Sequence, residues 1–232
     1  MAGRRGDKTR VRLAAFVLLL ALVGGAWGWW QGHHWQPARS TFPVQGVEIG
    51  AEDGIVDWKA LKAAGADFAY IDASASTFAR DPAFTRNQRQ AREAGLKTGS
   101  VHRYDPCQPG DKQAANFVVV VPRDAAMLPT AVELERTADE CPVATSDAEV
   151  ESELMIFLNQ VETHTGKNTL LKLGPKFEAR YAMAGRIERN LWLERDLLEP
   201  DYAGRPWILW TANSALASDH VAGQLRWVVA RP

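Results

Sequence analysis

The chain has 232 residues, of which 46% are hydrophobic and 24% are charged, and its formal net charge at pH 7 is −1. The apolar content excludes an intrinsically disordered protein, and the near-zero net charge provides no positive field for binding a nucleic acid. We therefore expect a folded protein without a nucleic-acid partner. Nine tryptophans are a high number, which suits a site that stacks on sugar rings, although several lie near an apolar N-terminal segment.

The N-terminal segment has the charge pattern of an exported protein. Residues 1–12 carry five basic side chains and one acidic side chain, whereas residues 13–30 carry no charge. A basic flank before about 18 apolar residues predicts an export signal or a single membrane span whose basic end stays in the cytoplasm. An uncleaved signal anchor is favoured, because tryptophans follow the apolar run as an aromatic belt would: Trp27, Trp29, Trp30 and Trp35.

A cleavable signal peptide is the alternative, with Gly24-Gly25-Ala26 as a weak cleavage site. An anchored chain would hold its folded part in the periplasm at the inner membrane, and a cleaved chain would be secreted. We expect residues 31–42 to form a short linker and residues 43–232 to form one domain with one core. Cys107 and Cys141 fit export, because a disulfide is the default state of two cysteines in an oxidising compartment. No Cys or His spacing indicates a metal, and we expect no cofactor.

Short apolar strands alternate with helices after the linker. The first five predicted strands are residues 44–49, 68–72, 98–104, 130–135 and 169–173. The helices between and after them are predicted to begin near residues 57, 81, 111, 147 and 175. After residue 184 the helices stop, and the remaining predicted strands are residues 191–193, 207–211 and 225–229.

This order of elements predicts an α/β fold with a parallel sheet. Five βα units followed by helix-poor strands predict a modified TIM-like (β/α) barrel whose last third is irregular. In such barrels the functional site lies at the carboxyl ends of the strands. Polar side chains near those predicted ends are expected to meet at one mouth: Glu48, Asp72, His102, Tyr104, Glu133 and Glu135.

The predicted strand 130–135 carries two carboxylates at alternate positions. Because residues i and i+2 of a strand point to the same face, Glu133 and Glu135 project together, about 6.6 Å apart along the backbone. Two unpaired carboxylates on an apolar strand are costly to bury. Cleavage of a glycosidic bond uses such a pair, one as proton donor and one as nucleophile, base or electrostatic stabiliser. The alternative is a half-exposed strand with a polar face.

Several collinear segments carry a family resemblance. They are Val44-Gln45-Gly46-Val47-Glu48-Ile49, Val56-Asp57-Trp58, residues 63–71, Asp81-Pro82-Ala83-Phe84, Ala94-Gly95-Leu96, Val101-His102 and Leu128-Pro129. Together they resemble glycoside hydrolase family 25, the lysozymes of the Chalaropsis type, over about residues 44–212. The resemblance implies a modified β/α barrel that hydrolyses the link between N-acetylmuramic acid and N-acetylglucosamine. Peptidoglycan glycan strands are therefore the expected partner, with the membrane as a second partner through the N-terminal segment.

The resemblance also implies roles for individual residues. The family motif Asp-x-Glu on the fourth strand places its proton donor at Glu135 and its aspartate at Glu133, and the first-strand aspartate corresponds to Glu48. We expect these three to be catalytic. The candidates for substrate binding are Asp72, His102, Tyr104 and Trp210, although Trp210 can equally belong to the core. Cys107 and Cys141 also stand where some bacterial members look disulfide-linked.

Other positions depart from the family pattern. Asp72 replaces a base, Ala75 replaces a glutamate, and Lys172 stands where the fifth strand usually has an aromatic residue. The terminal motif has Arg226 in place of an acid, which could balance Asp72 as a charge swap. Two functions therefore stay open. One is an exported muramidase, and the other is a catalytically impaired barrel that acts as a membrane-anchored peptidoglycan-binding or scaffold protein.

Overall fold

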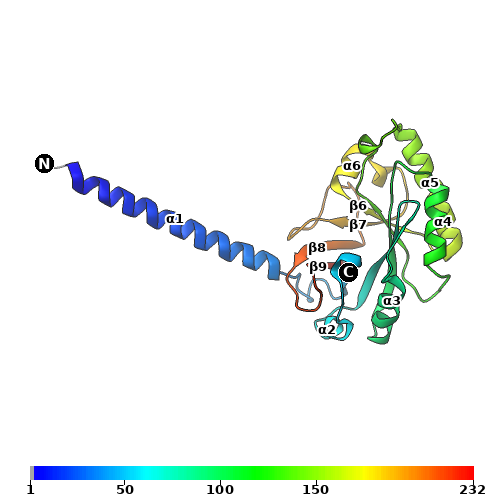
Figure 1. The fold of residues 1–232 in the computed structure, drawn as a ribbon, viewed down its shortest axis with the longest axis horizontal. Helices are drawn as coiled ribbons and strands as arrows, with labels where there is room; N and C mark the ends of the chain where they lie inside the picture. Colours follow the sequence, from blue (N-terminus) through cyan, green and yellow to red (C-terminus); the bar gives the residue numbers. More distant parts are fainter. Residues whose placement is uncertain (1–2) are drawn as a thin grey trace. The chain divides into compact units, whose positions relative to one another are not determined.

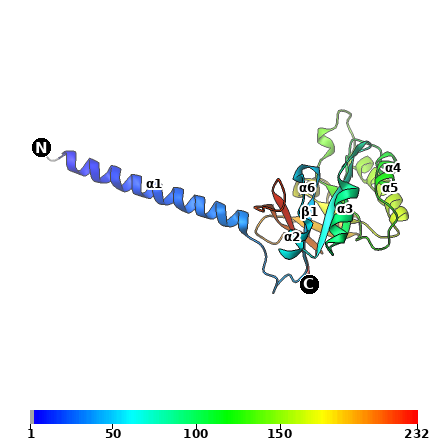
Figure 2. The same ribbon diagram turned by 60° about the horizontal axis from the view of Figure 1, so that its bottom comes forward.

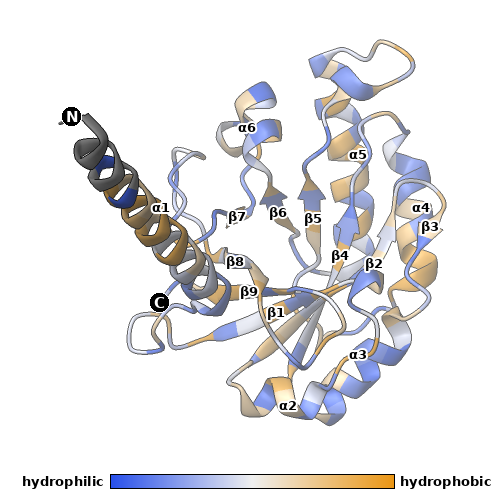
Figure 3. Ribbon diagram, turned by 60° about the vertical axis from the view of Figure 1, so that its left-hand side comes forward, coloured by the Kyte–Doolittle hydropathy of each residue, from blue (hydrophilic) through white to orange (hydrophobic). Residues whose placement is uncertain are grey.

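The computed structural model describes residues 3–232, without the side chains of residues 3–9 and 11, and the chain divides into two units, Met1–Trp35 and Gln36–Pro232. The first unit is the helix α1, Gly3–His34, which is hydrophobic along most of its described length (Figure 3). Its segment Arg12–His34 has a mean hydropathy of 1.9 and is long and apolar enough to cross a membrane. The predicted basic flank, residues 1–12, lies largely outside the described side chains.

The second unit is built around a closed barrel (Figure 1). Its eight strands within Gln45–Ala230 are β1 (Gln45–Ile49), β2 (Phe68–Ala75), β4 (Lys97–Arg103), β5 (Ala131–Leu134), β6 (Leu170–Leu173), β7 (Asn190–Glu194), β8 (Leu209–Leu216) and β9 (Leu225–Ala230). They pair in the order β1-β9-β8-β7-β6-β5-β4-β2, and pairing of β1 with β2 closes the barrel. β9 runs antiparallel to both of its neighbours, whereas the other pairs are parallel. The predicted modified barrel is confirmed.

Helices cover the outside of the first half of the barrel. They are α2 (Trp58–Ala63), α3 (Phe84–Glu93), α4 (Gly110–Val120), α5 (Asp147–Thr165) and α6 (Pro175–Tyr181). α4 and α5 lie side by side (Figures 1 and 2). α5 begins, as predicted, near residue 147, at a capping box in which Ser146 and Glu149 bond each other's backbone amides. Between Arg186 and Pro232 the structure has no α-helix, as the sequence predicts.

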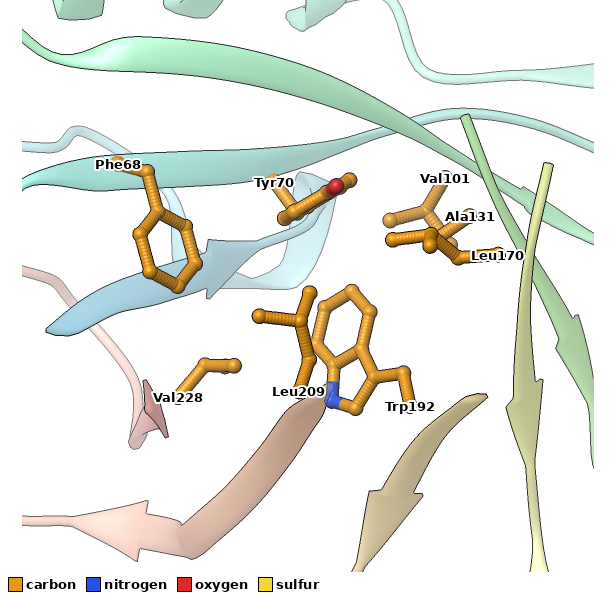
Figure 4. Packing of buried hydrophobic residues seen from close by; sticks show 8 residues of the cluster. All are labelled: Phe68, Tyr70, Val101, Ala131, Leu170, Trp192, Leu209 and Val228. Carbon is orange, nitrogen blue, oxygen red and sulfur yellow. The ribbon is translucent and has the colours of Figure 1, made fainter. Parts of the chain in front are cut away.

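Apolar side chains fill the barrel interior towards the amino-terminal ends of the parallel strands (Figure 4). This apolar layer consists of Phe68, Tyr70, Val101, Ala131, Leu170, Trp192, Leu209 and Val228. The rings of Tyr70 and Trp192 pack with centroids 4.9 Å apart. Strand side chains alternate between the two faces of a sheet, so the next inward residue on each strand stands two positions away.

The predicted linker, residues 31–42, divides between the two units. α1 continues to His34, and the residues from Gln36 onward belong with the barrel. Phe42 is buried and packs on Trp207 and Trp210, with ring centroids 6.2 and 5.6 Å apart. The Gln45 amide donates to the backbone carbonyls of Phe42 and Pro37, each at 2.9 Å. This segment therefore packs on the barrel and does not form a free tether.

Candidate active site

A charged layer lies directly above the apolar layer inside the barrel mouth. Six strands carry a charged side chain two positions from a member of the apolar layer: Asp72, Arg103, Glu133, Lys172, Glu194 and Arg226. On β9 the spacing runs backwards, from Val228 to Arg226, because this strand is antiparallel to its neighbours. Glu48 on β1 stands directly opposite Arg226 in the strand register and completes the layer.

Lys172 joins two of the predicted catalytic carboxylates. Its ammonium lies 2.6 and 2.8 Å from the two oxygens of Glu48 and 2.7 Å from Oε1 of Glu133. Lys172 and Glu48 are 4% and 1% exposed, so this contact is almost out of reach of water. Buried charges are tolerated when every one of them is paired and hydrogen-bonded. Lys172 is therefore the shared counter-cation of Glu48 and Glu133.

Two arginines extend this network across the mouth. Arg103 lies 2.5 Å from Asp72, 3.0 Å from Glu52 and 3.2 Å from the second oxygen of Glu133. Arg226 shares Glu52 with Arg103, at 3.0 Å, and also contacts Asp53 at 3.0 Å and Glu48 at 3.7 Å. The cation in direct contact with Asp72 is therefore Arg103. The charge of Arg226 also acts on Asp72 and lowers the pKa of that carboxyl, as the charge-swap hypothesis suggests.

The network gives the mouth carboxyls different protonation behaviour. Burial alone would raise the pKa of Glu133, but the Lys172 ammonium and the Arg103 guanidinium outweigh it, so this pKa lies below its usual range. Burial, helped by the Glu48 carboxylate, raises the pKa of Asp72 to about 8 against the opposing charge of Arg103. At neutral pH the mouth therefore combines an ionised Glu133 with a largely protonated Asp72.

Glu135 lies just beyond the last residue of β5. The ladder with β6 ends at the pair Leu134 and Leu173, so Glu135 has no strand partner and its side chain is exposed. The predicted strand is one residue too long at this end. Glu135 and Glu133 nevertheless line the same cleft, which has a volume of about 460 Å³. We call this space, which Tyr104 and Arg103 also line, the acidic cleft.

The loops that form one wall of the acidic cleft are cross-linked. The predicted disulfide Cys107–Cys141 is confirmed, with the two Cα atoms 5.3 Å apart, and it joins the loop after β4 to the loop after β5. Arg136 reinforces this link through Asp105 at 3.0 Å and Glu140 at 3.6 Å. The wall is therefore held by covalent and ionic contacts between two segments that are distant in sequence.

His102 does not reach the mouth, so the expectation that it gathers there is wrong. It stands between Val101 and Arg103, which both face inward, and strand alternation therefore turns it outward. Its ring bonds Ser74 at 2.8 Å and Gln113 at 3.3 Å and is fully buried. Burial lowers the pKa of His102 to about 4, so the ring is neutral at pH 7.

The two aromatic candidates differ in their surroundings. Tyr104 lines the acidic cleft but is 4% exposed, and within the described residues its buried hydroxyl has no hydrogen-bond partner. A substrate hydroxyl could supply that partner. Trp210 is 2% exposed, packs on Phe42, and donates its indole N–H to the carbonyl of Arg195 at 2.8 Å. This burial favours the core role for Trp210.

Sequence reasoning missed three cations and one acid of the charged layer as site residues. Lys172 and Arg226 stood out only as departures from the family, and Arg103 and Glu194 were not singled out. Their spacing of two positions from an inward apolar residue is the signal that would have found them. Among the residues whose side chains are described, no group of three or more His, Cys, Asp or Glu side chains could hold a metal ion.

Comparisons with known proteins agree with this geometry. The sequence profile of Glycosyl hydrolases family 25 matches residues 47–215. The uncharacterized protein YegX of Escherichia coli strain K12 is 24% identical over 191 residues, which cover 79% of this chain and 68% of that protein. A family 25 glycosyl hydrolase from Bacillus anthracis has a TM-score of 0.75 and 22% identity, covering 86% of this chain and 93% of that chain. A bacterial lysozyme from Streptomyces coelicolor has a TM-score of 0.73 and 20% identity, covering 82% of this chain and 92% of that chain. The two structures share the fold, and the profile match shows that the chain belongs to glycoside hydrolase family 25.

Proposed function

We propose that this chain is an exported N-acetylmuramidase that cleaves the bond between N-acetylmuramic acid and N-acetylglucosamine in peptidoglycan. Family membership supports the reaction class. The acidic cleft supports the site, because Glu133 and Glu135 line it together at the carboxyl end of β5. That shared lining by two carboxyls in unlike surroundings is the observation that carries the proposal.

Glu135 is the proton donor in this mechanism. Its side chain lies at the surface of the acidic cleft, where a bound glycan would cover it and separate it from water. A carboxyl group placed against the glycosidic oxygen is what general acid catalysis of this cleavage requires. Glu135 would then protonate the oxygen of the leaving sugar as the glycosidic bond breaks.

Glu133 supplies the negative charge. Lys172 and Arg103 hold it ionised, at 2.7 and 3.2 Å. An ionised carboxylate beside the sugar stabilises the positive charge that develops in an oxocarbenium-like transition state, or orients the acetamido group of the substrate. Glu48 acts one step further away, because it shares the Lys172 ammonium with Glu133.

The N-terminal helix supports a location in the cell envelope. Arg12–His34 would act as a signal anchor in the inner membrane, with the barrel in the periplasm, where the disulfide Cys107–Cys141 is stable. Cleavage of the helix would release the barrel instead. Membrane fractionation with an antibody against the barrel tests the anchor, and recovery of the intact chain in the soluble cytoplasm would contradict it.

A second function is favoured by one observation, the position of Lys172 between Glu48 and Glu133. Its ammonium already compensates the carboxylates that a muramidase directs at a cationic transition state. On this alternative the barrel binds peptidoglycan without cleaving it and serves as a membrane-anchored scaffold.

Incubation of the purified protein with cell-wall peptidoglycan separates the two functions. We expect the wild type to release muropeptides that end in a reducing muramic acid. Glu135→Gln should lower turnover by about 10²- to 10⁴-fold, because the amide keeps the shape but cannot donate the proton. Binding measured by co-sedimentation should stay within about twofold, a change of roughly 0.4 kcal/mol. If the wild type binds peptidoglycan but releases no muropeptides at any pH between acid and neutral, the proposed hydrolase function is refuted and the binding function takes its place.

A further inference from the structure

The hairpin that β2 forms with β3 (Ala79–Arg80) stands beside the acidic cleft and exposes an aromatic ring. β2 continues past the barrel rim to Ala75, and Ser76–Phe78 form the turn into β3. The ladder pairs Ala75 with Ala79 and Ser74 with Arg80. Phe78 is 78% exposed at this turn. The hairpin follows the carboxyl end of β2, so it lies at the same end of the barrel as Glu133.

Hydrogen bonds from two directions hold the turn in place. Asn116 of α4 is 3% exposed, and its amide donates to the carbonyls of Ser76 and Ala79 at 3.2 and 3.0 Å. Its amide oxygen accepts from Nε of Arg80 at 2.7 Å. On the other side, the hydroxyl of Ser76 donates to Asp105 at 3.0 Å. Ser76 has φ +50°, a left-handed conformation that non-glycine residues adopt only where the surroundings impose it.

A single exposed apolar side chain is ordinary on a protein surface. Phe78 differs because its turn is fixed, and a binding group on a rigid support loses little conformational entropy when a ligand arrives. Its neighbours on the hairpin also face two cavities. Ala75 and Ser76 line the acidic cleft, whereas Thr77 and Arg80 line a second cavity of about 560 Å³.

The second cavity differs in charge from the acidic cleft, whose lining combines four acids with three cations. It is lined by Thr77, Arg80, Gln108, Pro109, Lys112, Ala115 and Asn116. This set contains two cations and no acid. Lys112 lies 3.8 Å from the exposed carboxylate of Asp111, a contact that water screens, so the cavity still favours an anionic group. Pro109 and Gln108 follow Cys107 directly, and the disulfide therefore supports the walls of both cavities. We call this second space the basic cavity.

We propose that the glycan strand leaves the acidic cleft over Phe78 and that the basic cavity receives the carboxylates of its peptide side chains. This inference rests on the proposed function, because it takes peptidoglycan as the ligand. The flat ring of Phe78 offers an apolar face to the C–H face of a sugar. Lys112 and Arg80 offer cations that bind carboxylates through charge-assisted hydrogen bonds.

Binding to two forms of the polymer tests the proposal. Glu135→Gln serves as the parent, so that turnover does not consume the ligand, and co-sedimentation measures binding to purified peptidoglycan and to the same glycan stripped of peptide. We expect Phe78→Ala to weaken binding to both polymers by about tenfold. Lys112→Ala should weaken binding severalfold only when peptides are present. Phe78→Tyr should keep the affinity of the parent.

Val119→Ala is the matched control, because Val119 is an apolar residue of α4 that is 67% exposed and lines neither cavity. It should bind both polymers as the parent does. Undiminished binding by Phe78→Ala would overturn the proposal, and so would equal weakening of both polymers by Lys112→Ala. The muramidase assay on the unsubstituted protein is independent of these results. Binding that depends on Phe78, without release of muropeptides, would refute the proposed hydrolase activity and still support the proposed binding surface.

Discussion

The two layers inside the barrel stand two residues apart on the same strands, yet they are stabilised in opposite ways. In the apolar layer each side chain gains free energy by leaving water, whichever neighbour covers it. In the charged layer no side chain gains by burial alone. Each ionised member depends on a partner of opposite sign, and Asp72 instead keeps a proton. Leu170 and Lys172 on β6 show the difference within one strand, because they are 1% and 4% exposed respectively.

This difference has a consequence for function. An apolar layer tolerates the loss of one member as a cavity, whereas a charged layer responds by changing the protonation of the members that remain. The two layers touch at Trp192, whose ring centroid lies 5.2 Å from the Lys172 ammonium. The apolar layer thus gives the ion pairs of Glu133 a low-dielectric surrounding, which strengthens their electrostatic attraction.

The largest expected effect comes from Lys172→Met, which keeps an unbranched side chain one heavy atom shorter and removes its charge. Glu48 and Glu133 would remain buried without their shared cation, and such a loss costs about 3–5 kcal/mol of unfolding free energy. Urea unfolding at pH 7 measures it. The penalty should shrink as the pH falls through the pKa of Glu133 in the variant, which burial without the Lys172 charge raises above 4.5, because protonation then removes the charge of Glu133. The double variant Lys172→Met with Glu48→Gln should recover part of the loss.

Leu170→Ala makes the matching change in the apolar layer. It should cost about 2–5 kcal/mol, from lost burial and from the cavity that remains. The cost should be the same at pH 5 and at pH 8, because no charge is involved. A cost that varies with pH as that of Lys172→Met does would contradict the separation of the two layers.

The contribution of Asp72 to the free energy of unfolding should fall as the pH rises. Burial raises its pKa from 3.8 to about 8, so the folded protein keeps a proton that the unfolded chain releases. The stability that this proton provides is complete below about pH 4 and is lost as the pH rises towards 8. Relative to the wild type, Asp72→Asn should therefore become more stable between pH 5 and pH 8 in urea unfolding. If the stability difference between Asp72→Asn and the wild type is the same at pH 5 and at pH 8, the raised pKa of Asp72 is refuted.

His102 should show a smaller effect of opposite sign. Its pKa falls from 6.5 to about 4, so the unfolded chain binds a proton that the folded protein does not. The stability contributed by the neutral ring is lost as the pH falls from 6.5 towards 4. His102→Gln should remove this part of the acid sensitivity, and the unfolding midpoints of the two proteins at pH 7 and pH 4.5 provide the comparison.

Much of the fold follows from the sequence because its signals are local. The alternation of strands and helices predicts the barrel, and the loss of helices after residue 184 predicts its irregular last third. The ends of the elements are less well determined, because they depend on ladder partners, as the end of β5 at Leu134 shows. The disulfide could be predicted from the two cysteines, an exported location and the family resemblance.

The candidate site could be predicted only in part. Glu133 and Glu135 were found because they are neighbours on one strand, but Lys172 meets Glu48 across 124 positions of sequence. No local pattern encodes such a pair. His102 was misplaced because nearness to a strand end was given more weight than the alternation of faces. Arg226 was considered together with Asp72 but not with Lys172, although Lys172 and Arg226 share Glu48.

The central claim is that the charged layer holds Glu133 ionised as part of a working network. Titration of the Glu133 side-chain carboxyl by ¹³C NMR tests it most directly, with Glu133→Gln identifying the resonance. The account predicts a pKa below the ordinary value of 4.5 in the wild type and a pKa above that value in Lys172→Met. A wild-type Glu133 that titrates at or above 4.5, and that Lys172→Met leaves unmoved, would contradict the account.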